Sequence, residues 1–304
     1  YEIYCYKKGL AVELPGLLER LGSKIIGVES ARLTHALYDK MIEETRQAGL
    51  ECRFESQDDI LKHLRTQKDD DEIKIMKKAL AIAETSFLEL RTMIHPGMTE
   101  KKAAWLLEKF MRQNGADALS FPVIAASGKN SALPHAIPGD RVFLEGEPLL
   151  FDFGARWGGY CSDTTRTLVI GPPDDTFKAA YSVLNTAQQM AVDAIVPGMK
   201  CSDIDKIARD YINQSRFKDA FGHGLGHGVG RIHHHRVAGF GHFGQRLHID
   251  HQTVVAKAGT AFGQHDVGVA GAFDLGHHIG HVPRGKELAL FHVNGGTRFT
   301  GCQK

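Results

Sequence analysis

The most continuous hydrophobic pattern lies near the middle of the chain, in residues 149–171 (LLFDFGARWGGYCSDTTRTLVIG). Its flanking runs, LLF and LVI, are as apolar as strands buried in a sheet, and a tight glycine-containing turn separates them. The first predicted strand carries Asp152 and the second carries Asp163. If Trp157 and Gly158 form a two-residue turn, the two carboxylates lie directly opposite each other, with Cβ atoms roughly 4.5 to 5.5 Å apart.

Two carboxylates held that close in an apolar setting repel each other. The usual resolutions are a shared proton or bound cations. A pair of metal ions about 3.5 to 4 Å apart fits the predicted spacing. The alternative is an exposed hairpin with two ordinary polar aspartates, which the apolar flanking runs disfavour because they indicate burial.

Amphipathic helical patterns flank the hairpin and repeat. The acidic end of the stretch 67–72 is predicted to cap a long helix that runs to about Ile94. The motif I-x-P-G-M begins at Ile94 and again at Ile195, an offset of 101 residues. Each copy has the pattern of two helices separated by a Pro-Gly break, with Thr99 and Ser202 as N-caps. We expect a duplicated half-domain related by pseudo-symmetry; the alternative is a chance match between two helix breaks.

Three domains or segments are predicted. Residues 1–68 alternate short apolar runs with helical patterns, which is typical of an α/β unit. This unit is short and begins without Met, so we expect a partial N-terminal domain. A main domain follows over 69–230, and residues 231–304 form its C-terminal part, with an aberrant composition rich in His and Gly.

Two histidine-containing segments have the composition of loops. His135 lies in SFPVIAASGKNSALPHAIPGD, where Gly, Asn, Ser and Pro surround it. In FGHGLGHGVG, His223 and His227 share a face with Leu225 if the segment is extended, and the glycines let the backbone approach a ligand closely. Taken alone, a loop histidine such as His135 is usually a surface residue, and a plain glycine-rich turn is the less favoured alternative for the second segment.

Composition narrows the function classes. The chain has 304 residues, 42% of them hydrophobic and 24% charged, as in ordinary globular proteins. The net charge of +1 disfavours nucleic acid and anionic membranes as partners. No apolar run reaches the roughly 18 residues that span a bilayer, and no signal peptide is present at residue 1, so a cytoplasmic location is expected. The five scattered cysteines are expected to be reduced.

The motifs FDFG-x6-CSDTTRT, ALPH and GHGLGHGVG, in their order and spacing, resemble those of the pita-bread metallopeptidases. This family contains aminopeptidase P, prolidase, methionine aminopeptidase and creatinase. The resemblance implies an α+β pita-bread fold with a pseudo-twofold repeat, preceded by a partial α/β domain like that of aminopeptidase P and prolidase. It also implies metal-dependent hydrolysis of peptides with proline at the second position, and homodimers are common in the family.

The resemblance assigns roles to individual residues. Asp152 would bind one metal, Asp163 would bridge two, and His227 would bind the other; the ions would be Mn²⁺, Co²⁺ or Zn²⁺. His135 and His223 would lie beside the substrate, where they polarise the scissile carbonyl or stabilise the tetrahedral oxyanion. His234 falls on a further histidine of the family and is the third catalytic candidate.

The sequence departs from the family after Gly230. The family has two more glutamate ligands, in V-E-P-G and R-I-E-D segments, and neither segment is present. The last 74 residues hold 11 of the 17 histidines and only four acidic residues. The best placement puts His265 at the first glutamate and Gly280 or His281 at the second. Imidazole binds one metal but does not bridge two, so the second bridge of a dinuclear site would be lost.

Three explanations of this tail compete. It is a translation in the wrong reading frame or strand, or a divergent end on a pseudoenzyme that binds peptides or partners without cleaving them, or a separate metal site built from His233, His234, His235, His277, His278 and His281. A metal-free, creatinase-like hydrolase is a further alternative for the function. Because TVVA and LALF are its main apolar runs, the tail is expected to be poorly packed.

Overall fold

The computed structural model describes residues 4–30, 32–58, 65–196 and 198–230, and the strand backbone at 255–256, 286–293 and 296–303. The chain divides into two compact units, Tyr1–Arg65 and Thr66–Lys304. The structural division falls close to the charged stretch that marks a boundary in the sequence.

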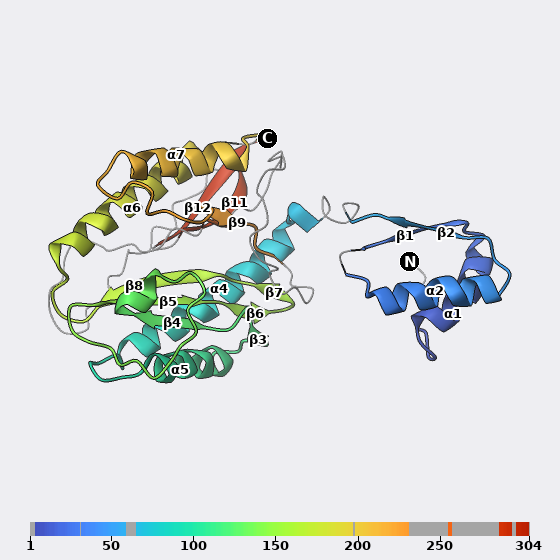
Figure 1. Ribbon diagram of the computed structural model, residues 1–304, viewed down its shortest axis with the longest axis horizontal. Coiled ribbons are helices and arrows are strands. Elements are labelled where there is room, and N and C mark those ends of the chain that lie inside the picture. The colour runs from blue at the N-terminus through green and yellow to red at the C-terminus, as the bar shows by residue number, and fades with distance from the viewer. Residues whose placement is uncertain are drawn as a thin grey trace. The chain divides into compact units, whose positions relative to one another are not determined.

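The first unit is a small α/β arrangement (Figure 1). It contains α1 (Leu10–Leu21), β1 (Ile25–Val28), α2 (His35–Gln47) and β2 (Arg53–Ser56). Strands β1 and β2 are parallel, so α2 is the crossover of a β-α-β unit. The buried core of this unit consists of four residues, Ala11, Leu14, Leu18 and Met41. The α/β class expected for this segment is therefore confirmed.

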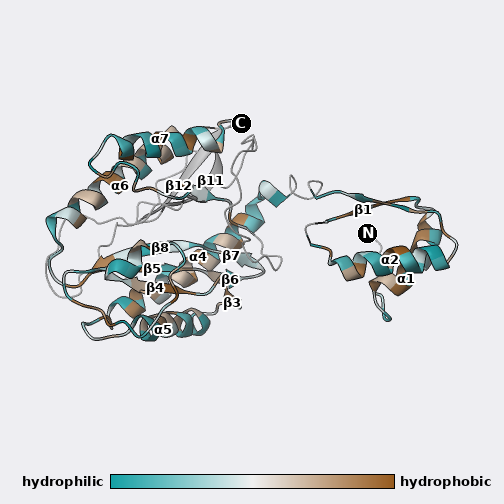
Figure 2. Cartoon of the chain, in the orientation of Figure 1, coloured by the Kyte–Doolittle hydropathy of each residue, from teal (hydrophilic) through white to brown (hydrophobic). Residues whose placement is uncertain are grey.

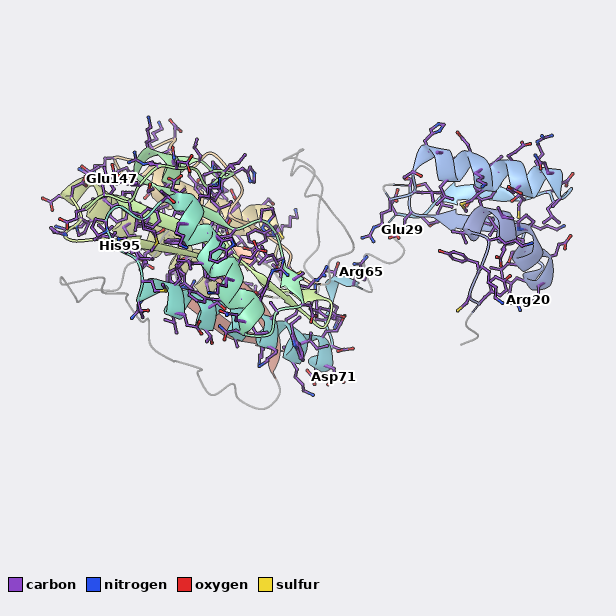
Figure 3. All side chains as sticks on the ribbon, turned by 90° about the horizontal axis from the view of Figure 1, so that it is seen from below. Arg20, Glu29, Arg65, Asp71, His95 and Glu147 are labelled. Atoms are coloured by element: carbon purple, nitrogen blue, oxygen red, sulfur yellow. The ribbon has the colours of Figure 1, made fainter. Side chains whose placement is uncertain are left out.

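The second unit begins with the first helix pair. Helix α4 (Asp70–Arg91) starts with a capping box, in which the Asp69 side chain accepts from the Glu72 backbone and Glu72 reaches back to the Asp69 backbone. Asp71 lies in the first turn of this long helix, and His95 lies just beyond its last residue (Figure 3). Helix α5 (Glu100–Gln113) is capped by Thr99, as predicted.

A second helix pair repeats this arrangement. Helix α6 spans Asp175–Ala194 and α7 spans Cys201–Asn213, so α5 and α7 begin 101 residues apart, at the offset of the sequence repeat. The predicted N-cap at Ser202 is wrong. The N-cap is Lys200, which makes no side-chain cap, and Ser202 lies inside the first turn, where the backbone is already helical.

The strands between α5 and α6 along the chain form two antiparallel sheets. Strands β4 (Ile124–Ser127), β5 (Pro148–Phe153) and β8 (Thr164–Val169) form one sheet in the order β4-β5-β8. A second sheet has the order β3-β6-β7, built from Ala118–Leu119, Ala155–Trp157 and Tyr160–Cys161. In Figure 1, α5 lies on one side of the β4-β5-β8 sheet and α6 and α7 on the other.

The hairpin register differs from the prediction by two residues. Trp157 pairs with Tyr160, so Gly158 and Gly159 form the turn, with φ of 57° and 82°. Two positive φ angles are what a two-residue hairpin turn of the favoured hand requires, and glycine adopts them without strain. Because of this shift, Asp152 pairs with Thr165 and not with Asp163.

The main hydrophobic core lies between the first helix pair and one face of the β4-β5-β8 sheet. Along β5, Phe151 and Phe153 are fully buried, and the ring of Phe87 on α4 contacts both, at centroid distances of 5.6 and 5.2 Å. The helices carry hydrophobic and hydrophilic turns side by side (Figure 2), as expected for helices with one buried face. None of the described helices is long and apolar enough to cross a membrane.

Strand structure is also present after Gly230. Strand β9 (Gly226–His227) pairs with β10 (Val255–Ala256), which is parallel to β11 (Lys286–Val293), and β11 pairs with β12 (Gly296–Gln303). The apolar runs TVVA and LALF contribute to β10 and β11. The tail therefore has more regular backbone structure than its sequence pattern predicts.

Candidate active site

Asp152 lies near the end of β5, on the sheet face opposite the phenylalanine core. Alternation along the strand puts Phe151 and Phe153 on the core side and Asp152 on the other. Only 4% of Asp152 is exposed, and Thr165 Oγ1 donates to its Oδ1 at 2.9 Å. The strand thus places a carboxylate inside the protein with one hydroxyl donor already bound to it.

Asp163 lies in the short break between β7 and β8, and 7% of it is exposed. The pairing register is the same on both sides of the break, since Asp152 pairs with Thr165 and Arg156 with Cys161. The two aspartates are therefore diagonal neighbours on one face, roughly 7 to 8 Å apart with their Cβ atoms somewhat closer. This spacing is wider than predicted; it disfavours a shared proton and leaves room for cations.

Gly154 explains the break in the hairpin. A Cβ on this residue would lie 2.0 Å from the Ser162 carbonyl oxygen, so only glycine allows the two strands to approach so closely. This close approach lies between Asp152 and the turn of the hairpin. Gly154 therefore belongs to the geometry that brings the two carboxylates to one face.

His227 is in contact with Asp163. Its Nε2 lies 3.3 Å from Asp163 Oδ2, and its side chain is 44% exposed. On the other side of the ring, Nδ1 lies 3.1 Å from the Gly228 carbonyl oxygen. Because a carbonyl oxygen only accepts, this contact assigns a proton to Nδ1 and directs Nε2 at the carboxylate. Nε2 then either carries a second proton or, together with Asp163, faces a cation.

The donor types fit a divalent cation, but the described residues supply an incomplete set. Asp163 and His227 are a carboxylate and an imidazole in contact, and Asp152 adds a second carboxylate on the same face. Within residues 4–30, 32–58, 65–196 and 198–230, no three His, Cys, Asp or Glu side chains are grouped closely enough to hold a metal ion. A complete site needs further ligands.

His223 and His135 lie on two different segments. His223 packs edge-to-face on Phe221, at a centroid distance of 4.7 Å, and its Nδ1 lies 2.9 Å from the Gly224 carbonyl oxygen. His135 is exposed and follows the short helix η1 (Gly128–Ala132). Among the described residues, no metal-binding group of three side chains joins either ring to Asp152 and Asp163, and His234 lies outside those residues.

Helix α7 anchors the glycine-rich segment that carries His223. The Arg209 guanidinium donates to the Phe221 and His223 carbonyl oxygens at 2.7 and 2.8 Å, while it is paired with Asp205. Asp205 Oδ1 also accepts from the Leu225 backbone at 2.8 Å. The sequence analysis missed this pair, because an i, i+4 ion pair on a helix usually lies on a solvated surface.

Glu100 plays a similar part on α5 and was also missed. Only 1% of this residue is exposed, and its carboxylate accepts hydrogen bonds from the loop that carries His135. An acidic residue in the first turn of a helix is common, so the sequence gives no sign of burial.

A half-buried ion pair lies on the core face of the same sheet. Arg166, which pairs with Phe151, donates to Glu84 of α4 at 2.9 Å. Burial lowers the pKa of Arg166, and the Glu84 carboxylate counteracts this. Burial also raises the pKa of Tyr181 well above its usual range, so this phenol stays neutral. Arg166 pairs with Phe151 and so lies on the sheet face opposite Asp152.

Comparisons with known proteins agree with this architecture. Residues 74–265 match the model of metallopeptidase family M24, a range that continues beyond Gly230. The chain is 37% identical over 230 residues to the uncharacterized peptidase YqhT of Bacillus subtilis, and 34% identical over 230 residues to a Xaa-Pro dipeptidase of Pyrococcus horikoshii. Each alignment covers 76% of this chain, and it covers 64% and 66% of the two relatives.

Solved structures show the same fold. An X-Pro aminopeptidase of Thermotoga maritima superimposes with a TM-score of 0.69 and 36% identity, over 74% of this chain and 63% of the other. A prolidase of Pyrococcus furiosus superimposes with a TM-score of 0.66 and 33% identity, over 82% of this chain and 68% of the other. The chain thus spans about two thirds of the length of these proteins.

Proposed function

Because the chain belongs to metallopeptidase family M24 and has its α+β pita-bread fold, we propose that it hydrolyses peptide bonds next to proline. The proposed substrate is a peptide with proline at the second position, as the names of the Xaa-Pro relatives suggest. The observation that supports this best is the contact between Asp163 and His227, with Asp152 on the same buried face.

Asp152, Asp163 and His227 are the proposed metal ligands. Burial of the two carboxylates disfavours two uncompensated charges, and a cation between them would offset the repulsion. Two divalent ions, Mn²⁺, Co²⁺ or Zn²⁺, would lower the pKa of a water molecule enough to make it a nucleophile near neutral pH. The Gly228 carbonyl, by fixing the proton on Nδ1, keeps the other ring nitrogen of His227 directed at the site.

His135 and His223 are the proposed substrate-facing residues, and His234 is a third. An imidazole that donates a hydrogen bond to the scissile carbonyl stabilises the oxyanion as it forms. The contact between His223 Nδ1 and the Gly224 carbonyl assigns the proton to Nδ1, so Nε2 donates only when the ring is protonated. His223 would therefore act as an imidazolium.

A second candidate function is peptide binding without turnover. It is favoured by the incomplete ligand set among the described residues and by the loss of both family glutamates after Gly230. His265, which we place at the first glutamate, and Gly280 or His281 at the second, lie outside the described residues. On this proposal the tail is a divergent end and the site holds one ion weakly.

Incubation of the purified chain with Mn²⁺, Co²⁺ or Zn²⁺ and an Xaa-Pro dipeptide separates the candidates. Cleavage that a chelator abolishes and that Asp163→Asn removes supports the peptidase. Asp193→Asn, on an exposed position of α6, is the matched control and should leave the rate unchanged. Tight peptide binding without cleavage would establish the binding module, and cleavage that survives chelation would point to the metal-free hydrolase.

We also propose that the chain works in the cytoplasm and forms a homodimer, and that it needs neither nucleic acid nor membrane. The small net charge of +1 supports the absence of nucleic acid as a partner. Light scattering of the purified chain tests the dimer: a mass near twice 33.5 kDa is expected, and a mass near 33.5 kDa at micromolar concentration would contradict it.

A further inference from the structure

The Glu100 carboxylate is buried and accepts several hydrogen bonds from one loop. Its Oε1 accepts from the Ser127 backbone at 2.7 Å, from Ser127 Oγ at 2.8 Å and from Asn130 Nδ2 at 3.1 Å. Its Oε2 accepts from the Gly139 backbone at 3.2 Å and from Asn130 Nδ2 at 3.3 Å. Hydrogen bonds to a carboxylate are stronger than those between two neutral groups, so each of these donors is held firmly.

The backbone at the start of α5 binds the same loop. The Glu100 N–H donates to the Arg141 carbonyl oxygen and the Lys101 N–H to the Gly139 carbonyl oxygen, both at 2.9 Å. These are N–H groups of the first helical turn, which have no partner within the helix. Carbonyl groups of the loop thus accept from the free N–H groups of the helix, and the Glu100 carboxylate on the helix accepts from N–H and O–H groups of the loop.

These hydrogen bonds fasten both ends of the segment 127–139 to the start of α5. Ser127 ends β4 and Gly139 lies beyond His135, so Glu100 holds both ends with one side chain. Arg141 adds a further bond, from its Nε to the Ser127 carbonyl oxygen at 3.1 Å, and its Nη2 donates to Glu147. Glu147 lies at the same end of the unit as His95 (Figure 3).

We propose that Glu100 is a positioning residue that acts through His135. His135 is exposed and lies in the part of the loop between the two anchored ends, so these ends set the course of the backbone that carries the ring. A shift of either anchored end should therefore move the ring. This inference rests on the proposed function, in which His135 contacts the substrate.

Replacement of the carboxylate by an amide should disturb the loop without a change of volume. In Glu100→Gln the amide oxygen still accepts from one side, but the NH₂ group faces donors on the other side. Either the Ser127 donors or the Gly139 N–H then lose their acceptor. A displacement of His135 of about 1 Å should lower kcat roughly 100-fold and change KM little, if the imidazole acts in the transition state.

A double-mutant cycle tests whether the effect passes through His135. Glu100→Gln, His135→Ala and the double variant are compared with wild type and with Glu108→Gln, an exposed position on the same helix. We expect Glu100→Gln to lower kcat in the wild type and to have little further effect once His135 is alanine. Glu108→Gln should behave as wild type. Equal effects of Glu100→Gln in both backgrounds would overturn the proposal.

Two readouts that need no catalysis keep this test separate from the proposed function. Hydrogen exchange of the amides of 127–139 should accelerate in Glu100→Gln while exchange in 221–225 stays unchanged. The His135 ring resonance, identified by its loss in His135→Ala, should shift in the same variant. If wild type does not cleave peptides, the proposed function fails and these readouts still decide: unchanged exchange and an unchanged ring resonance refute the positioning role.

Discussion

The two halves of the internal repeat anchor a histidine-bearing segment in two chemically different ways. In the first half, α5 holds the loop of His135 through Glu100, a carboxylate that is 1% exposed and accepts only from uncharged donors. In the second half, α7 holds the segment of His223 through Arg209 and Asp205, an ion pair with side chains 33% and 25% exposed. The repeat thus preserves the position of the anchoring helix and not the chemistry of the anchor.

The difference in burial sets the expected energies. Removing a buried acceptor leaves its donors unsatisfied, at roughly 1 to 3 kcal/mol for each group. A partly exposed ion pair contributes less because water replaces lost partners, and an exposed pair contributes about 0 to 1 kcal/mol. We therefore expect the first half of the repeat to be the more sensitive to loss of its anchor.

The largest effect is expected for Glu100→Ala. Ser127 N–H, Ser127 Oγ and the Gly139 N–H lose a buried acceptor together, which should lower the free energy of unfolding by about 3 kcal/mol. For a unit of this size the melting temperature should fall by roughly 10 °C, as measured by calorimetry. Glu108→Ala is the control on the same helix. A loss as small as that of the control would show that water replaces Glu100.

A smaller effect is expected for Arg209→Met, which keeps an unbranched side chain but loses the guanidinium that lies 4.8 Å from the centroid of the Phe221 ring. The Phe221 and His223 carbonyl oxygens lose a charged donor, and Asp205 loses its partner. Urea unfolding should show a loss of about 1.5 to 2 kcal/mol. Lys206→Met, in an exposed pair with Asp210, provides the baseline. A loss larger than that of Glu100→Ala would reverse the comparison between the halves.

The sequence predicted the positions of the helices in the two halves better than the contacts that these helices make. Helix positions follow from periodicity and from the Pro-Gly breaks, so both pairs and the cap at Thr99 were found. The anchoring residues were not found. At the repeat offset Glu100 aligns with Cys201, so the repeat does not point to it. Whether an acidic residue in the first turn is buried depends on a loop far along the chain. Packing across distant segments leaves no periodic signal.

In the candidate site, too, the sequence pointed to the residues but not to their exact pairing. Asp152, Asp163 and His227 could be selected from motifs, and the structure brings Asp163 and His227 together. The hairpin register was wrong by two residues because the sequence G-G offers two adjacent turn positions, and only pairing decides between them. The face that the two aspartates share was nevertheless predicted, since a shift of two residues preserves alternation.

Thr99→Ala should reveal the difference between the helix starts. Thr99 Oγ1 accepts from the Lys102 backbone at 3.1 Å, so its loss should destabilise the unit by about 1 kcal/mol. Ser202→Ala, at the position that sequence analysis had taken for the second cap, should change the urea midpoint very little because Ser202 lies inside α7. Equal losses from the two variants would mean that Ser202 has a capping role after all.

The smallest effect is a gain, expected for Lys200→Thr. Lys200 has φ −76° and ψ 140°, and Thr99 has φ −82° and ψ 150°, so the backbone before α7 already has the conformation of a capped start. Lysine has no side-chain oxygen to accept from the first turn. A threonine at this position should therefore form the bond that Thr99 forms in the first half.

The expected stabilisation is about 0.5 to 1 kcal/mol, seen as a higher urea midpoint with an unchanged slope. Lys200→Ala is the control, since it removes the same lysine without adding an oxygen. If Lys200→Thr and Lys200→Ala give the same urea midpoint, a threonine before α7 does not form the cap that Thr99 forms before α5. The two helix starts then differ in more than this residue. A gain with threonine alone means that one side chain accounts for the difference.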